Sequence, residues 1–337
     1  MNKYGFKSVL SEQLEGYILD FEARGNCIKR TLYIIKEFDA FLAEQRLSEP
    51  CFSIELYEKW LSTFKGLSSS TICRKASFVR SFAIYLTKMG FCCAIPRLPK
   101  HRTSNYVPYI FTKDEMRKIF EVCDKMVAPC RTLTSIMITM PSLLRLLYST
   151  AIRIGEALSI RNRDVDFSRH IIYLSQTKNG HDRLAPINPT LEGVLRQYIH
   201  FRNQIPIKDI DAPENYLFVS LRGKRVSHRA VFENFKKILD TAGIVDAYNS
   251  KLPRLHDIRH TACIHAMHKL LSKEKDLYCH LPILATFMGH LNVSDTEYYL
   301  RLAQQYYPDL VKQQVSLVEP ITGIINRALI IKQDDYV

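Results

Sequence analysis

The first hundred residues carry apolar side chains at intervals of three and four positions, the spacing that gathers them on one face of an α-helix. This spacing holds over residues 11–24, 29–44 and 54–63. A fourth helix is predicted after Ser68–Thr71, whose hydroxyls suit the cap of a first turn, and it should end near Gly90. The N-terminal part of the chain is therefore predicted to be a helical bundle.

A proline-rich stretch interrupts this pattern. Pro96, Pro99 and Pro108 alternate with polar residues, which is typical of a linker. Beyond it, Thr112 is followed three positions later by Glu115, the spacing of a capping box at the start of a helix. We therefore divide the chain into a helical domain, a linker, a second domain and a C-terminal tail, at 1–95, 96–110, 111–314 and 315–337.

The second domain combines helices with a short hairpin. Helical spacing continues to about Arg161, and residues 171–175 and 183–187 have the pattern of two short strands. The dipeptide Asn179-Gly180 between them is a strong signal for a tight turn. Helical spacing then returns. The predicted fold class is mainly α with a small β-sheet: an N-terminal helical bundle followed by an α+β domain.

The charge of the chain favours a polyanionic partner. Among its 337 residues, 47 are Lys or Arg and 34 are Asp or Glu, which gives a net charge of +13. From Lys59 to Lys113 there are ten basic residues and no acidic one. A surface built only for solubility mixes both signs, whereas one that follows phosphates excludes carboxylates, so nucleic acid is favoured over an anionic membrane surface. The candidate DNA contacts in this stretch are Arg74, Lys75, Arg80, Lys100 and Arg102.

The sequence does not predict export or insertion into a membrane. The first ten residues lack the apolar core of a signal peptide, and the longest apolar stretch, 133–147, is interrupted by Pro141 and Arg145. The nine cysteines are scattered without a C-x-x-C pair, as expected for reduced thiols. The predicted location is the cytoplasm, in association with the nucleoid.

Two basic side chains of the second domain are candidates for ligand binding. Arg153 lies among apolar residues, where burying a charge is costly unless it meets an anion. That anion can be a bound phosphate or simply a carboxylate of the chain, such as Glu156. Lys178 lies at the tip of the predicted hairpin, from which it can reach a ligand, although most hairpin lysines are exposed edge charges.

Histidines gather in the last third of the chain. His256 and Arg259 are three positions apart in a helical pattern, so they share a face. His256 and His260 have the four-residue spacing of zinc ligands, but the segment does not read H-E-x-x-H and no cysteine or glutamate supports it. A metal site is therefore disfavoured. Gly289-His290 follows, ahead of two adjacent tyrosines.

In order and spacing these residues resemble the tyrosine recombinase family of DNA recombinases, also called phage integrases. The family signature runs arginine, lysine, H-x-x-R, then G-H and a tyrosine nine positions after that histidine. It is matched here, in this order, by Arg153, Lys178, His256 with Arg259, Gly289-His290 and Tyr299. The resemblance covers the second domain in outline, and the basic helical domain before it is similar to the core-binding domain of the family.

The local contexts extend the match and also depart from it. Glu156 stands at the glutamate of the usual T-G-L-R-x-x-E setting, and His260-Thr261 continues the third motif. Ala151 replaces the usual glycine and Met288 the usual leucine, changes that leave the reacting groups intact. Leu300-Arg301 replaces the usual x-H after the tyrosine, a peripheral position.

The chemistry of phosphodiesters assigns the phosphate-binding groups. A phosphodiester is an anion that resists attack, so its transition state needs added positive charge and a placed nucleophile. We assign Arg153 and Arg259 to its non-bridging oxygens, because a guanidinium grips two oxygens and keeps its proton. His290 is expected to donate a further hydrogen bond to the phosphate, and Glu156 to orient its neighbours.

The same chemistry assigns the groups that react. Tyr299 is the expected nucleophile, preferred to Tyr298 by its spacing from the G-H motif; adjacent helical residues point about 100° apart, so only one can face the phosphate. A phenol with an ordinary pKa near 10 needs a proton acceptor at neutral pH, for which His256 is the candidate. Lys178 is the candidate acid for the departing 5′ oxygen. By resemblance the product is a 3′-phosphotyrosyl enzyme.

The resemblance also implies partners and excludes cofactors. Four copies of the chain are expected to assemble on two double-stranded DNA sites and to exchange strands without ATP. Converging carboxylates are absent from the motifs, so no catalytic metal and no other cofactor is expected. The tail contains an apolar run over 321–331, which can pack on its own domain or on a neighbouring copy. The alternatives are a type IB topoisomerase, a DNA-binding protein without activity on the same scaffold, and a membrane-surface or structural protein.

Overall fold

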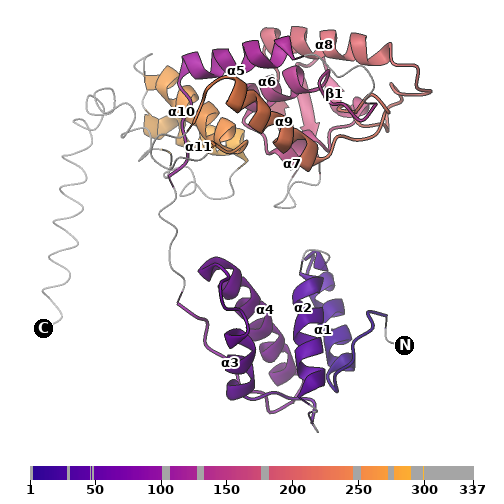
Figure 1. The fold of residues 1–337 in the computed structure, drawn as a ribbon, viewed down its shortest axis with the longest axis vertical. Helices are drawn as coiled ribbons and strands as arrows, with labels where there is room; N and C mark the ends of the chain where they lie inside the picture. The colour runs from indigo at the N-terminus through magenta and orange to yellow at the C-terminus, as the bar shows by residue number, and fades with distance from the viewer. Residues whose placement is uncertain are drawn as a thin grey trace, which may run out of the picture. The chain divides into compact units, whose positions relative to one another are not determined.

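The computed structural model describes residues 3–28, 31–45, 47, 49–100, 107–126, 133–175, 182–245, 252–271, 277–289 and 299. The chain divides into two compact units, Met1–Tyr106 and Val107–Val337. The described residues are mainly helical and form a three-stranded sheet, which confirms the predicted fold class (Figure 1). None of the helices in these described ranges is both long and apolar enough to cross a membrane.

The regular secondary structure described in the first unit is helical. Two of its helices begin at hydroxyl caps, of which the one at Ser68 was predicted: the side chains of Ser53 and Ser68 accept hydrogen bonds from the N–H groups of Leu56 and Thr71, both at 3.3 Å. Aromatic rings fill the space between the helices, with Phe38 and Trp60 packed edge to face. The helices are α1 (Ser11–Ala23), α2 (Leu32–Glu44), α3 (Ile54–Ser62) and α4 (Ser69–Lys88).

The second unit contains further helices and the sheet. Its α-helices are α5 (Lys113–Lys125), α6 (Met140–Thr150), α7 (Ile154–Ala157), α8 (Pro189–Asn203), α9 (His228–Thr241), α10 (Asp257–Leu271) and α11 (Leu277–Met288). A short 3-10 helix, η2 (Asn162–Asp164), leads into the strands β1 (Val165–Asp166), β2 (Ile171–Leu174) and β3 (Arg183–Pro186).

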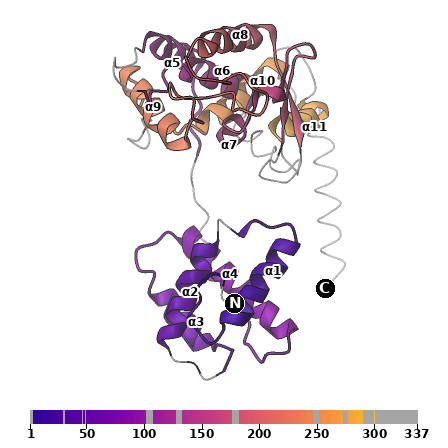
Figure 2. The ribbon, with the colours of Figure 1, turned by 90° about the vertical axis from the view of Figure 1, so that its right-hand side faces the viewer.

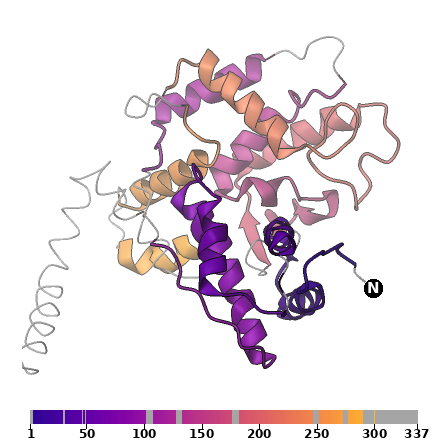
Figure 3. The ribbon, with the colours of Figure 1, turned by 60° about the horizontal axis from the view of Figure 1, so that its bottom comes forward.

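Helix α6 lies at the centre of the second unit. Leu143, Leu144, Leu146 and Leu147 are all buried. Because successive helical residues point about 100° apart, these leucines make α6 apolar on several sides. It packs against α5, α8 and α10, and α10 packs in turn against α11 (Figures 2 and 3). This arrangement brings α10 and the ends of α6 and α11 together.

The sheet holds the predicted hairpin in antiparallel register. Strand β2 pairs with both neighbours in the order β1-β2-β3, and Leu174 stands opposite Arg183. Residues 175–182 therefore connect the two strands from that pair. The predicted turn Asn179-Gly180 and Lys178 lie outside the described residues.

The start of the second unit is fixed as the sequence predicts. Thr112 and Glu115 form the capping box: the Thr112 hydroxyl accepts from the Glu115 N–H at 3.1 Å, and the Glu115 carboxylate accepts from the Thr112 N–H at 2.7 Å. The N–H of Phe111 donates to the hydroxyl of Thr261 at 3.0 Å. These bonds tie the entry of the unit to α10.

Candidate active site

The site begins at a left-handed residue after α6. Ala151 has φ 51° and ψ 22°, and its N–H donates to the carbonyl of Leu147 at 3.0 Å, which ends the helix. A side chain in this backbone region costs about 1 kcal/mol, which is why glycine is common there. The turn aims the Ala151 carbonyl at Arg259, whose guanidinium donates a hydrogen bond to it.

Glu156 binds two arginines from different parts of the chain. Its carboxylate accepts from the N–H and the guanidinium of Arg153, both at 2.9 Å, and from the guanidinium of Arg183 at 2.8 Å. The Glu156 side chain is only 5% exposed. Burial by itself raises the pKa of Glu156, but these hydrogen bonds and the nearby charge of Arg183 hold it below its ordinary value. The carboxylate is therefore ionised and cross-links the two arginines.

Three arginines bind successive carbonyls at the C-terminal end of α11. Arg183 donates to the carbonyl of Phe287 at 2.9 Å, and Arg153 to that of Gly289 at 3.3 Å. Between them, Arg259 donates to the carbonyl of Met288. The last carbonyls of a helix lack partners within it and carry the negative end of the helix dipole, so they attract cations. We call Arg153, Glu156, Arg183 and Arg259 the arginine cluster.

Gly289 allows this close approach. Its φ of 65° lies in the region that favours glycine, and a Cβ atom there would stand 2.6 Å from Nε of Arg183. Both the backbone conformation and the contact exclude a side chain. The glycine of the G-H motif thus makes room for an arginine that comes from the β-hairpin.

The arginine cluster carries a positive charge that is largely buried from solvent. Arg259 is 3% exposed. Burial, and then the charge of Arg153, lower the pKa of Arg259 to about 10, so it stays charged at neutral pH. Within the cluster, three guanidiniums face the single carboxylate of Glu156, so these four side chains together carry a net positive charge. Such a place suits an anion with several oxygens.

His256 and His260, at the start of α10, and Tyr299 lie beside this cluster. The His260 ring lies between two others: 4.8 Å from the His256 ring, edge to face, and 5.5 Å from the ring of Tyr299, measured between centroids. Tyr299 is 4% exposed and packs with Ala151 and Met288, whose carbonyls receive Arg259. The structure thus gathers Arg153, Glu156, His256, Arg259 and Tyr299. Lys178, His290 and Tyr298 lie outside the described residues.

Arg183 is the member of the cluster that the sequence analysis did not identify. At the start of a strand it had the pattern of an ordinary edge residue. Its partners, Glu156 and the carbonyl of Phe287, are distant in sequence. The only available signal was its position shortly after the hairpin lysine.

No metal-binding group occurs in the parts of the chain that the structure describes. Among those residues, no three histidine, cysteine, aspartate or glutamate side chains are placed to share an ion.

The candidate DNA contacts of the first unit divide into two kinds. Lys75 is buried: its ammonium binds the Glu37 carboxylate at 2.5 Å and lies 3.9 Å from the centre of the Phe64 ring. Lys75 is therefore partnered and only 6% exposed, and a contact of its ammonium with DNA, which stays a prediction, would require it to leave Glu37.

The other basic residues differ in their surroundings. Arg80 donates to the carbonyl of Pro96 at 2.5 Å and so holds the chain that leaves α4. Arg74 donates to the Tyr33 hydroxyl at 2.7 Å, and its side chain is exposed to solvent. Lys100 is exposed, and Arg102 lies outside the described residues.

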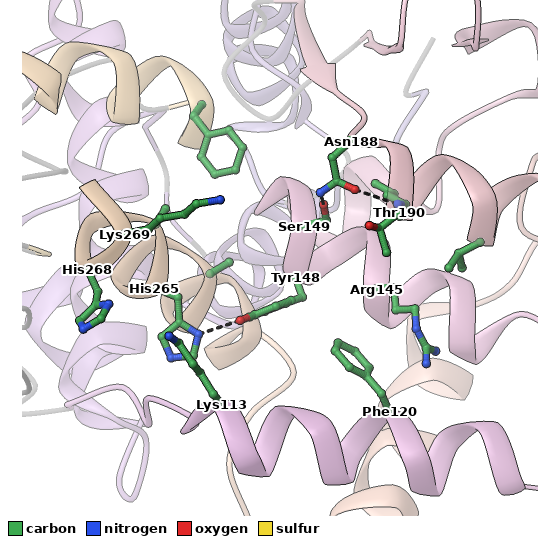
Figure 4. Close-up of a pocket in the computed structure, with 15 residues that line it drawn as sticks. Lys113, Phe120, Arg145, Tyr148, Ser149, Asn188, Thr190, His265, His268 and Lys269 are labelled. Atoms are coloured by element: carbon green, nitrogen blue, oxygen red, sulfur yellow. Dashed lines mark hydrogen bonds between the residues drawn. The ribbon is translucent and has the colours of Figure 1, made fainter. Parts of the chain in front are cut away.

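A separate cavity of about 800 Å³ opens between α5, α6, α8, α10 and α11 (Figure 4). Phe120, Tyr148 and Phe287 are among its apolar walls, and Lys113 and Lys269 are among its basic lining. None of the predicted site residues that the structure describes lines it. The end of α11 serves both places, because Phe287 faces the cavity while its carbonyl binds Arg183.

Comparisons with known proteins agree in family and in fold. Residues 110–306 match the family model described as "Phage integrase family". The y4rB protein of Sinorhizobium fredii, which bears the name of an integrase/recombinase, is 28% identical over 316 residues, covering 93% of this chain and 98% of the relative. The tyrosine recombinase XerC of Roseiflexus sp. is 25% identical and covers 79% of each chain.

Solved structures show the same fold. The XerH site-specific recombinase, bound to palindromic difH substrate in a post-cleavage complex, has a TM-score of 0.58 at 17% identity, over 79% of this chain and 73% of that one. A lambda integrase dimer bound to a COC' core site also has a TM-score of 0.58, at 15% identity, over 86% of this chain and 76% of that one.

Proposed function

Because the chain belongs to the phage integrase family of tyrosine recombinases, we propose that it is a site-specific recombinase that cuts and rejoins double-stranded DNA through a covalent bond to Tyr299. One observation carries this proposal. Arg153 and Arg259 bind neighbouring carbonyls at the end of α11, and Tyr299 belongs to the buried apolar cluster of Ala151 and Met288, whose carbonyls receive Arg259.

The guanidiniums of Arg153 and Arg259 bind the non-bridging oxygens of the scissile phosphate. Each guanidinium has five N–H donors, and the protein contacts described above use only some of them. The remaining donors are held in place by those same contacts, so little reorganisation accompanies the reaction. His290 adds a hydrogen bond to the phosphate, and Glu156 fixes Arg153.

Tyr299 attacks phosphorus, and its phenol proton passes to His256. The burial of Tyr299 means that attack requires its segment to expose the phenol oxygen to the phosphate. The bond from phosphorus to the 5′ oxygen breaks, and Lys178 supplies the proton that makes a 5′ hydroxyl. The 3′-phosphotyrosyl bond keeps the energy of the phosphodiester, so rejoining needs neither ATP nor a metal.

Assembly on DNA follows the family pattern. Four copies hold two recombination sites, and the 1–95 domain follows the DNA backbone with exposed basic residues such as Arg74 and Lys100. The 111–314 domain carries the chemistry, the 96–110 segment links the two, and the 315–337 tail packs on its own or a neighbouring copy. Such an enzyme works in the cytoplasm, at the nucleoid.

Two rival functions make different products. A type IB topoisomerase relaxes supercoiled DNA without joining two defined sites, and a DNA-binding protein on this scaffold forms no adduct. A two-site recombination assay run beside a supercoil relaxation assay separates these activities.

The decisive experiment traps the covalent complex. Incubating the protein with genomic DNA and denaturing it should leave DNA attached to the protein, and sequencing that DNA identifies the target site. Tyr299→Phe should bind the recovered site with unchanged affinity and yield no adduct. An adduct that survives this change assigns the nucleophile elsewhere, first to Tyr298.

Cleavage should also persist when metals are removed. We expect the same amount of adduct in excess EDTA as in its absence, because positive side chains rather than an ion stabilise the transition state. Loss of adduct in EDTA that returns with a divalent ion would overturn the metal-free scheme.

A further inference from the structure

We propose that Arg183 is a positioning residue that fixes the hairpin bearing Lys178 to the arginine cluster and so aims the general acid at the 5′ oxygen. This inference rests on the proposed function. It adds to that function a residue that acts through another, rather than one that touches the DNA.

Arg183 joins three parts of the second unit. Its guanidinium donates to the Glu156 carboxylate at 2.8 Å and to the carbonyl of Phe287 at 2.9 Å. Its side chain is 12% exposed, and a Cβ on Gly289 would collide with it. One residue therefore connects β3 with the short helix α7 and with the end of α11.

The position of Arg183 in the sheet places this connection next to the segment that contains Lys178. It is the first residue of β3 and pairs with Leu174, the last residue of β2. Leu174 and Arg183 thus form the pair of the sheet between which the segment with Lys178 stands in the sequence. Anchoring Arg183 therefore anchors one end of the segment that carries the proposed acid.

A merely stabilising role would not require this geometry. A buried arginine is costly unless its charge is matched, and the carboxylate that pairs with it in the described part of the chain, Glu156, also holds Arg153. Through that shared partner, the distance between the phosphate-binding arginine and the hairpin is set by two short ion pairs of 2.9 and 2.8 Å. Displacement of a catalytic group by about 1 Å lowers a rate by about 100-fold.

The chemistry of the leaving group offers a readout specific to Lys178. In the normal reaction the phenol oxygen of Tyr299 bonds to phosphorus, the bond to the 5′ oxygen breaks, and Lys178 protonates that oxygen. With sulfur in place of the 5′ oxygen, a thiolate leaves without a proton, because a thiol has an ordinary pKa of about 8.5. Such DNA bypasses the general acid and leaves the phosphate-binding arginines as necessary as before.

The experiment measures the rate of adduct formation on two synthetic duplexes of the site recovered by trapping, one normal and one with a 5′-bridging sulfur. The variants are Arg183→Met, Arg183→Lys and Arg259→Lys. Arg169→Met serves as the control, because Arg169 precedes β2 of the same sheet, is 72% exposed and carries the same charge. Thermal unfolding of each variant shows which of them are folded.

We expect Arg183→Met to slow cleavage of normal DNA by about 100-fold and to cut the sulfur-containing DNA within about threefold of the wild-type rate. Arg259→Lys should remain slow on both duplexes, and Arg169→Met should match the wild type on both. Arg183→Lys, which keeps the charge and one contact, should show the same rescue from a smaller defect. If Arg183→Met does not fold, the Arg183→Lys variant alone tests the role of Arg183.

Failure of this inference is distinguishable from failure of the proposed function. If the wild type forms no adduct with either duplex, the proposed function is wrong. If the wild type cuts and the folded Arg183 variants cut normal DNA at its rate, only the role of Arg183 is wrong. Equal defects of these variants on the two duplexes would likewise overturn it. The defect would then not lie in the protonation step, which the sulfur-containing duplex does not need.

Discussion

At the scale of single residues, the site depends on positions where a small change in shape has a large effect. Gly289 and Ala151 both have positive φ values, but they meet different surroundings. Gly289 faces the Arg183 side chain at less than contact distance for any added carbon, whereas Ala151 already carries a methyl group in its buried place. Substitution at Gly289 therefore tests the arginine cluster directly.

Gly289→Ala should destabilise the protein by about 1–3 kcal/mol, since it adds backbone strain and displaces Arg183. It should also slow adduct formation. The matched control is Gly243→Ala, because Gly243 has nearly the same φ, 66°, and no atom within 4 Å of its added carbon. Denaturant unfolding and adduct assays of both variants check this. If Gly289→Ala and Gly243→Ala lose the same stability, and Gly289→Ala cuts DNA at the wild-type rate, the contact between Gly289 and Arg183 does not matter for the site.

Arg259→Lys should cripple the chemical step although it keeps the charge. A lysine cannot donate to the carbonyls of Ala151 and Met288 and still offer a planar pair of donors to a phosphate. We expect single-turnover cleavage to fall by 100-fold or more, in line with the loss of one preorganised donor, with DNA affinity changed much less. A rate near that of the wild type would show that the guanidinium fork is not needed.

At the scale of elements, the sequence predicted the helices better than their meeting points. The predicted caps at Ser68 and Thr112 are local signals, because a hydroxyl and an N–H three residues away suffice to form them. The three arginines at the end of α11 are not local, since they come from three distant segments. The motif spacing of the family therefore identified Arg153 and Arg259, but it gave no sign of Arg183.

Lys75 illustrates the same limit from the opposite side. Its place in a stretch without acidic residues predicted a phosphate contact. The compensating carboxylate, Glu37, belongs to α2 and lies 38 positions away. Charge counted along the chain cannot reveal a pair made by packing two helices.

The contact between α6 and α10 should make stability depend on pH. The Tyr148 hydroxyl and Nδ1 of His265 are 2.8 Å apart (Figure 4). Burial first, and then the charges of Lys113 and His268, lower the pKa of His265 from 6.5 to about 4. Between these two values the unfolded chain binds a proton that the folded protein does not, so stability falls as the pH drops from 6.5 to 4.

Unfolding measured by denaturant at several pH values checks this. His265→Gln should show a shallower loss over that window, by up to roughly 3 kcal/mol at its acid end. His200→Gln is the control, because His200 lies exposed near the end of α8. A slope that His265→Gln leaves unchanged would assign the acid sensitivity to other groups, such as Glu156 with its lowered pKa.

At the scale of the whole molecule, the excess of positive charge matters only where a phosphate can reach it. A cation that contacts a DNA phosphate releases a counterion, so its loss reduces the slope of log affinity against log salt by about 0.9. Arg74 and Lys100 are exposed, whereas Lys75 carries the same charge inside an ion pair. The three residues therefore separate net charge from accessible charge.

We expect Arg74→Gln and Lys100→Gln each to reduce the salt slope of binding by about 0.9, and Lys75→Met to leave it nearly unchanged. Binding to a duplex of the recovered site, measured between low and moderate salt, provides the slopes. Lys75→Met should instead lower thermal stability, because the Glu37 carboxylate loses its partner. A full reduction of the slope by Lys75→Met would mean that this lysine leaves Glu37 for a phosphate, and that charge along the sequence is the better guide to the DNA-binding face.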